Sequence, residues 1–323
     1  MKHLHRAALL LAASALFVFG ASAQPYPNHP IRLIVADSAG GAPDQLGRLI
    51  AQKLSESLGQ PVVVDNRAGA GGALGAEVVA KSPPDGYTLL MTTTAIYAIL
   101  PDLRKNLPYD PVKDFAPISR IATASNVLVV NNALPAKDIA ELVKLAKAKP
   151  GAFNYASAGV GTPAHLAGEM LNLLADIKVI HVPYKGAAPA LTDVIAGNAQ
   201  FIITSPIAAG AHLAGGRVRA LATTGVERNP ALPNLPTIAE TVPGYEITQT
   251  WGIVAPAGTP AEITSRLNAE IVKVMSQPEV KEKVLATGAT PVSDAPAAFG
   301  AYMAKERQRL GEVIAKSHIV LAD

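Results

Sequence analysis

The chain has 323 residues, of which 49% are hydrophobic and 16% are charged, a composition typical of a globular protein with a large apolar core. This length is sufficient for one large domain or two medium ones. The formal charge of +3, without runs of like charge, argues against a nucleic-acid-binding protein, and the absence of cysteine excludes disulfides and cysteine nucleophiles.

A secretory signal peptide is expected over residues 1–23. Basic Lys2 and Arg6 precede an apolar stretch at 7–19, and Ala21-Ser22-Ala23 has the small-residue pattern of a cleavage site. The stretch is shorter than the roughly 20 residues that a membrane span needs, which argues against a membrane anchor. Since a lipid anchor would require a cysteine, we expect a soluble periplasmic protein whose formal charge, without Lys2 and Arg6, is +1.

The mature chain alternates strand-like and helix-like segments, which predicts an α/β fold. The first unit should contain strands at 31–37, 61–66 and 86–94 and helices at 43–59 and 71–83. Two strand-like pieces follow within 117–132. A second unit should contain helices at 138–151, 162–176 and 189–197 and strands at 153–157, 178–184, 199–205 and 218–225.

The C-terminal part offers one strand, 248–256, and two helices, 260–277 and 295–317. Because one strand cannot form a third sheet, we expect this part to return to the first unit. The predicted organisation is therefore two parallel-sheet lobes with a ligand cleft between them. Lobe 1 would comprise 24–124 and 225–323, and lobe 2 would comprise 125–224. In open α/β sheets ligands bind at the carboxyl ends of the strands.

The turn "DSAGGAPD" at 37–44 joins a strand to a helix N-terminus. Gly40 and Gly41 would let the backbone approach a ligand and direct N–H groups at an anion. The alternative is an ordinary loop whose helix is capped by Asp44. Asp37 is unexpected in an anion site: it could point away from the anion or accept a hydrogen bond from a ligand hydroxyl, and its role stays open.

A second turn, "NYASAGVGTPAHLAGE" at 154–169, repeats this pattern. Ser157, Gly159, Gly161 and Thr162 precede a helix that carries His165, a candidate anion site, although a lone histidine such as His165 is more often structural. Hydroxyl groups follow two further strands, and these candidates are Thr93, Thr94, Thr204 and Ser205.

Catalytic patterns are missing from the sequence. There is no G-x-S-x-G or H-E-x-x-H motif, and the histidines lack metal-ligand spacing. The segment "NRAGAGGALGAE" at 66–77 misses the G-x-G-x-x-G spacing of dinucleotide sites. We therefore expect a protein that is not an enzyme and uses no cofactor and no metal.

Many short stretches, in order, resemble the Bordetella uptake gene family, the extracytoplasmic receptors of tripartite tricarboxylate transporters. They include "AGGAPDQLGRLIAQKL", "LGQPVVVDNRAGAGGALGAEVVAKSPPDGYTLL", "NYASAGVGTPAHLAGE" and "HVPYKGAAPALTDVIAG" and cover nearly all of the mature chain. The resemblance implies a type II periplasmic binding protein fold. Two lobes would close over a small organic carboxylate and deliver it to integral membrane permease subunits.

The resemblance also implies a ligand-binding site. It points to Ser38, Ala39, Gly40 and Gly41 on one side, to Ser157, Gly161 and Thr162 opposite, and to Thr93, Thr94, Thr204 and Ser205 around the remainder. The family often has proline and an aromatic residue where this chain has Ala36-Asp37. Members that bind amino acids tend to have aspartate at the position of Thr204, so this chain should prefer another ligand, unless Asp37 has taken over that role.

We thus expect a monomeric receptor for an aromatic carboxylate such as terephthalate or for an aliphatic dicarboxylate. Two alternatives stay open. The protein could be a sensor subunit that presents its ligand to a membrane kinase, or an exported hydrolase that uses Ser157 in "NYASAG" as its nucleophile.

Overall fold

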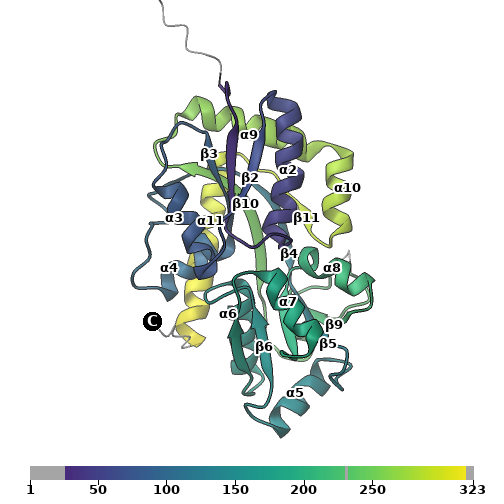
Figure 1. Cartoon of the computed structure of the whole chain (residues 1–323). Coiled ribbons are helices and arrows are strands. Elements are labelled where there is room, and N and C mark those ends of the chain that lie inside the picture. The colour runs from purple at the N-terminus through teal and green to yellow at the C-terminus, as the bar shows by residue number, and fades with distance from the viewer. Residues whose placement is uncertain (1–25, 230–231, 318–323) are drawn as a thin grey trace, which may run out of the picture.

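The computed structural model describes residues 26–229 and 232–317, so the expected signal peptide, 1–23, lies outside the described residues. The described chain folds into two α/β bodies, one above the other in Figure 1, each built on its own β-sheet. The expected two-lobed α/β class is therefore confirmed. Among the helices of 26–229 and 232–317, none combines the length and the apolar character that crossing a bilayer requires.

The first sheet has six strands in the order β11-β4-β10-β3-β1-β2. They are β1 Ile31–Val35, β2 Val62–Asn66, β3 Thr88–Thr93, β4 Phe115–Ser125, β10 Thr248–Pro256 and β11 Thr290–Pro291. Strand β1 is parallel to β2 and β3, whereas β10 is antiparallel to β3 and β4. Since β10 lies between β3 and β4, the expectation that the C-terminal part completes the first sheet is confirmed.

The second sheet has five strands in the order β7-β6-β8-β5-β9. They are β5 Val127–Asn131, β6 Asn154–Ser157, β7 Ile180–Pro183, β8 Phe201–Thr204 and β9 Val218–Thr223. Strand β6 is parallel to β7 and β8, whereas β5 is antiparallel to β8 and β9.

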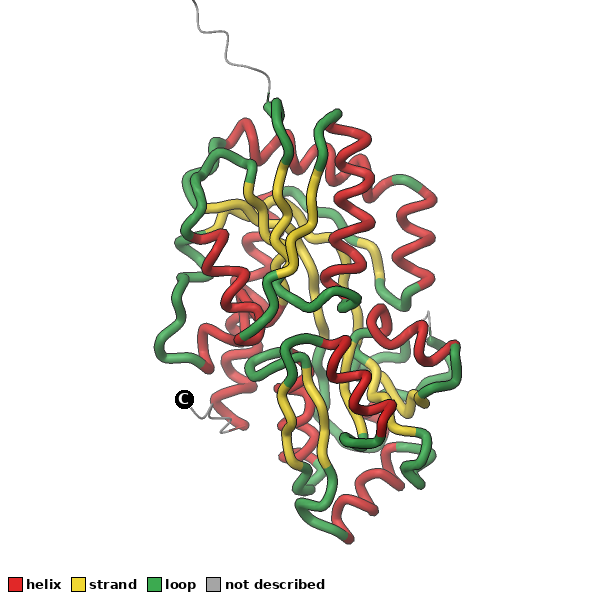
Figure 2. Tube along the Cα trace, in the orientation of Figure 1, coloured by secondary structure: helices red, strands yellow, loops and turns green. Residues whose placement is uncertain are grey.

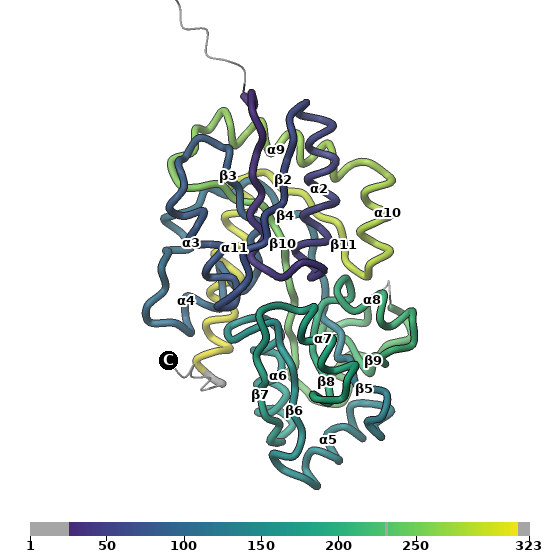
Figure 3. Tube along the Cα trace, viewed as in Figure 1, coloured from purple at the N-terminus to yellow at the C-terminus, as the bar shows by residue number. Residues whose placement is uncertain are grey.

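The expectation that both sheets are purely parallel is wrong, and the path of the chain explains why. Only Asn126 separates β4 from β5, so the chain crosses directly from one body into the other without a helix. Strand β5 therefore runs away from the cleft, while β6, β7 and β8 run toward it and end there, as β1 and β3 do in the first body (Figure 3).

Ten helices cover the described sheets, and short turns of 3₁₀- and π-helix occur at Ala70–Gly72, Ala95–Ile99 and Ile238–Glu240. The helices are α2 Ala42–Leu58, α3 Ala73–Ala80, α4 Leu100–Leu103, α5 Ile139–Ala148, α6 Pro163–Leu174, α7 Ala187–Ala196, α8 Pro206–Ala214, α9 Ala261–Ser276, α10 Pro278–Ala286 and α11 Pro296–Ser317. Residues spaced by four along α2, Leu46, Ile50 and Leu54, belong to the same buried cluster as Leu33 of β1. This spacing is the apolar stripe expected of a helix that covers a sheet.

Helix α11 contacts both bodies. Near its start, Phe299 is buried with Ile34 and Leu90 of the first sheet. Toward its end, Leu310 shares an apolar cluster with Leu166 of α6 in the second body. The C-terminal helix therefore runs alongside the junction of the two bodies, as Figure 1 shows in yellow.

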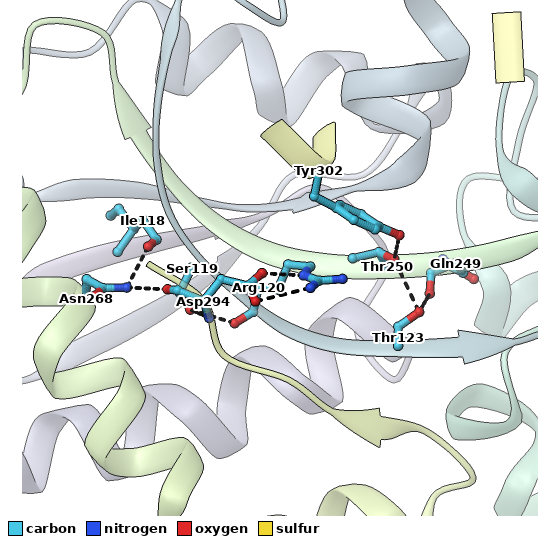
Figure 4. Close-up of polar contacts among 9 residues, drawn as sticks. All are labelled: Ile118, Ser119, Arg120, Thr123, Gln249, Thr250, Asn268, Asp294 and Tyr302. Carbon is cyan, nitrogen blue, oxygen red and sulfur yellow. Dashed lines mark hydrogen bonds and ion pairs between the residues drawn. The ribbon is translucent and has the colours of Figure 1, made fainter. Parts of the chain in front are cut away.

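A polar cluster ties β4, β10, α9 and α11 together beside this junction (Figure 4). Asn268 of α9 donates to the carbonyl oxygens of Ile118, at 2.8 Å, and Asp294, at 2.6 Å. Arg120 of β4 pairs with Asp294 and stacks over the ring of Tyr302, 4.1 Å from its centroid. The cluster fixes β10, whose residue Gln249 faces the cavity described next.

Candidate functional site

A cavity lies between the two bodies, where the carboxyl ends of their strands meet. Its volume is about 50 Å³, well below the roughly 300–1,000 Å³ of typical small-molecule sites. The lining residues are Ala36, Asp37, Ala42, Pro43, Gly69, Gly71, Gly72, Thr93, Ala95, Ala158, Thr162, Pro163, Ala164, Lys185, Ala187, Thr204, Ser205 and Gln249. Small residues and hydroxyl groups predominate, so the cavity suits a compact ligand that accepts hydrogen bonds.

The N-termini of four helices reach this cavity. Helix α2 contributes Ala42 from the first body, while α6, α7 and α8 contribute Pro163, Ala187 and the N-cap Ser205 from the second. The first N–H groups of a helix have no partner within it, and the helix dipole places partial positive charge there. The convergence of four such ends gives the cavity partial positive charge, which is favourable for an anion.

Asp44 orders the turn that precedes α2. Its Oδ2 accepts the Gly40 N–H at 2.8 Å, and its Oδ1 lies 2.9 Å from a guanidinium nitrogen of Arg48. Burial alone would raise the pKa of Asp44, but hydrogen bonds from Arg48, Gly40 and Asn66, with the Arg48 charge, hold this pKa below its ordinary value. The expectation that Asp44 caps α2 is therefore wrong, since the N-cap is Gly41, and Asp44 holds the turn through Gly40 instead.

Replacing Asp44 with alanine should lower the free energy of unfolding at pH 7 by about 2 kcal/mol, because a charged hydrogen-bonding partner is lost from a buried site. The pKa of Asp44 is lowered in the folded state, so its contribution is fully present above the unfolded pKa of about 3.9 and is lost as the pH falls through the lower folded pKa. Urea unfolding of Asp44→Ala and wild type at pH 7 and at pH 3 measures the difference in their free energies of unfolding at each pH.

The control for Asp44→Ala is Glu262→Ala, which removes an exposed acid from the first turn of α9. We expect a loss of less than about 1 kcal/mol for the control, the usual size of a helix-dipole contribution. Equal losses for the two variants, or a loss for Asp44→Ala that is as large at pH 3 as at pH 7, would contradict this role of Asp44.

The second turn is held by buried contacts of its own. Thr162 caps α6 by accepting the His165 N–H at 3.3 Å, and it donates to the Gly159 carbonyl at 2.7 Å. His165 Nδ1 accepts the Gly161 N–H at 3.2 Å, and its ring stacks on His181 at a centroid distance of 4.1 Å. These contacts give His165 a structural role in the turn.

Buried Ser157 pairs with half-buried His181, with 2.6 Å between Oγ and Nε2. Burial, and then the neighbouring His165, lower the pKa of His181 to about 3, so the ring is neutral at physiological pH. Ser157 has no exposed surface and does not line the cavity. A ligand in the cavity therefore cannot reach its hydroxyl, which argues against the hydrolase alternative. No group of three or more potential metal-binding side chains occurs within 26–229 and 232–317.

The structure divides the sequence-predicted site residues into two groups. Thr93, Thr162, Thr204 and Ser205 line the cavity together. The others do not line the cavity and lie in or beside the turns that shape it, namely Ser38, Ala39, Gly40, Gly41, Thr94, Ser157, Gly159, Gly161 and His165. Whether any of these residues contacts a ligand stays a prediction.

Three polar lining residues were not among the predicted site residues: Asp37, Lys185 and Gln249. Asp37 follows the first strand in the chain, and Lys185 precedes α7, so their positions at strand and helix ends were the available signals. Gln249 lies within β10, where the alternation of a strand gives no indication of a cavity.

The turns of the two bodies touch across the cavity. A Cβ atom placed on Gly71 would lie 2.5 Å from the carbonyl oxygen of Val160, and one on Gly186 would lie 2.2 Å from Ser38 Oγ. Real Cβ atoms do not approach other atoms so closely, so both contacts require glycine. The structure is therefore one in which the two bodies are closed against each other.

Comparisons with known proteins agree with this architecture. The family model "Tripartite tricarboxylate transporter family receptor" matches residues 46–319. The "UPF0065 protein in tcbD-tcbE intergenic region" of Pseudomonas sp. (strain P51) is 40% identical over 291 residues, which are 90% of this chain and 86% of that protein. "Protein BugT" of Bordetella pertussis is 36% identical over 313 residues, which are 94% of this chain and 96% of that protein.

Two solved structures with bound carboxylates are also similar. Rpa4515 of R. palustris with adipate has a TM-score of 0.89 and 36% identity, and the match covers 91% of this chain and 99% of that one. MatC (Rpa3494) from Rhodopseudomonas palustris with bound malate has a TM-score of 0.85 and 30% identity, and the match covers 90% of this chain and all of that one.

Proposed function

This chain belongs to the tripartite tricarboxylate transporter receptor family, and we propose that it captures a small organic carboxylate in the periplasm and delivers it to the membrane permease of such a transporter. The observation that carries the proposal is the convergence of four helix N-termini from both bodies on one cavity. Main-chain N–H groups and hydroxyls there can hold a carboxylate without supplying a nucleophile.

The proposed ligand is an aromatic carboxylate such as terephthalate or an aliphatic dicarboxylate. The similar structures with adipate and malate support a small carboxylate. The alanines of the lining present apolar surface to a hydrocarbon body, while Thr93, Thr204 and Ser205 offer hydroxyl donors. The neutral Thr204 offers no charge to an ammonium group, which supports a ligand other than an amino acid.

The proposed division into lobes follows the sheets. Lobe 1 comprises 24–124 and 225–323, lobe 2 comprises 125–224, and residues 1–23 are removed on export. The strands of the first sheet lie within 31–125 and 248–291, and those of the second lie within 127–223. The chain therefore crosses between the bodies twice, at Asn126 and between 223 and 248, which supports lobe boundaries at these two crossings. The mature receptor acts as a monomer whose lobes open and close about these crossings.

Binding of a carboxylate should raise the melting temperature of the mature protein and make it more compact, because a ligand that bridges both lobes favours the closed form. A thermal-shift screen against benzoate, terephthalate, adipate and malate, with glucose and putrescine as controls, identifies ligands. Small-angle scattering with and without the best ligand measures closure. Stabilisation by the sugar or the amine but by no carboxylate would refute the proposal, as would an unchanged radius of gyration at saturation.

A further inference from the structure

The carboxyl group of Asp37 lies between two glycines, one from each body. A Cβ on Gly41 would lie 2.6 Å from Asp37 Oδ2, and a Cβ on Gly186 would lie 2.5 Å from Oδ1. The carboxyl group therefore fills the space that side chains at both positions would need. In Figure 2 the loop after β1 lies beside the start of α7 in the second body, where Gly186 is the N-cap.

Asp37 occupies the anion-binding end of α7. Its Oδ1 accepts the Ser38 N–H at 2.7 Å, and the backbone of Ala187, the first residue of α7, also forms a hydrogen bond with it. One of the four helix N-termini around the cavity thus already faces a carboxyl group of the protein. A second carboxylate at this end of the cavity would meet that group instead of free amides.

The groups around Asp37 offer little positive charge. Asp44 of α2 raises the pKa of Asp37 slightly and is itself paired with Arg48. From β2, Asn66 donates to the Asp37 carbonyl and is neutral. Lys185, in the loop before α7, is an exposed cation that also lines the cavity. Burial is the main influence, opposed by the backbone hydrogen bonds, and it raises the pKa of Asp37 to about 6.

We propose that Asp37 determines specificity at the α7 end of the cavity: it accepts a neutral end of the ligand, and it accepts a second carboxylate only when a proton is shared between the two carboxyl groups. The proposal rests on the proposed function, because it concerns the second end of the same ligand. Two carboxylates in contact cannot both ionise, since like charges a few ångströms apart raise the pKa of one of them. The protein thus binds a dicarboxylate with uptake of a proton and a monocarboxylate without one.

Isothermal titration calorimetry with chemically matched ligands tests the proposal. The ligands are benzoate against terephthalate and hexanoate against adipate, each measured from pH 5.5 to pH 8.5. Above pH 7, where terephthalate and adipate are fully ionised, their affinity should fall by up to tenfold per pH unit, while that of the monocarboxylates should not. Titration in buffers of different ionisation enthalpy should show uptake of up to one proton per dicarboxylate.

The variant Asp37→Asn keeps the shape of the side chain and removes its charge. At pH 8 the ratio of dicarboxylate to monocarboxylate affinity should rise at least tenfold over wild type, and its pH dependence should disappear. The control is Asp176→Asn, which removes one negative charge from an exposed position just beyond α6. It should keep the ratio and the pH dependence of the wild type, and circular dichroism checks that both variants are folded.

The outcomes separate the two proposals. Carboxylates that bind with the same ratio and pH dependence in Asp37→Asn as in wild type would overturn the role of Asp37 and leave the proposed function intact. If the affinity of the wild type for dicarboxylates does not change with pH, the proposed role of Asp37 is overturned as well. If no carboxylate binds to wild type or to Asp37→Asn at any pH, the proposed function itself fails.

Discussion

Gly186→Val should abolish ligand binding while both lobes remain folded. Gly186 has φ of 143°, a conformation that side chains rarely adopt, and a Cβ there would lie 2.2 Å from Ser38 Oγ across the cleft. The overlap exists only when the lobes are closed, so the substitution penalises the closed form. Because closure is required to hold the ligand between both lobes, we expect affinity to fall at least about a hundredfold, equivalent to roughly 3 kcal/mol.

The matched control is Gly151→Val. Gly151 also has a positive φ, 74°, but a Cβ there would meet no atom within 4 Å. Both variants should lose about 1–3 kcal/mol of stability from backbone strain, while only Gly186→Val should lose binding. Calorimetry measures the ligand affinity of each variant, and small-angle scattering measures how far each variant becomes more compact when the ligand binds. Equal affinities for the two variants would show that contact between Ser38 and Gly186 is not part of the bound state.

Local patterns predicted most of the elements. Gly59 ends α2 in the left-handed conformation, with φ of 69°, as expected of a glycine that follows a helix. The family resemblance, which depended on many short motifs in order, is confirmed by the family model.

The sequence did not predict helix α8, although Ser205 and Pro206 are typical of a helix start. The helix has only nine residues and directly follows a strand. Helix α10 was missed because it begins immediately after Gln277, the expected end of α9.

The strand directions and part of the cavity could not be predicted from local patterns. An antiparallel β10 between β3 and β4 depends on how a distant segment returns to the first sheet. Thr93 and Thr204 follow from the rule that ligands bind at strand ends. Asp37 has a role only because Gly186, 149 positions later in the sequence, leaves space for its carboxyl group. Contacts of this kind depend on closure of the lobes and carry no periodic signal.

Trp251→Ala should cause the largest loss of stability among single substitutions in the first lobe. Trp251 lies on β10, pairs with Thr93 of β3 and Ala122 of β4, and has no exposed surface. Its ring belongs to the buried cluster that also contains Leu33 and Ile253. Truncating a buried Trp typically costs about 3–5 kcal/mol, because burial is lost and a cavity remains. For a chain of this size we expect the melting temperature to fall by roughly 10 °C.

Trp251→Phe separates the packing of the ring from its polar group. Among the described residues, the indole Nε1 has no hydrogen-bonding partner, so phenylalanine loses ring volume but no hydrogen bond and should cost less than half as much as alanine. Thermal unfolding followed by circular dichroism measures all three proteins, since substitution removes the only tryptophan of the chain as a fluorescent reporter. If alanine and phenylalanine destabilise equally, the cost comes from the indole N–H and not from packing.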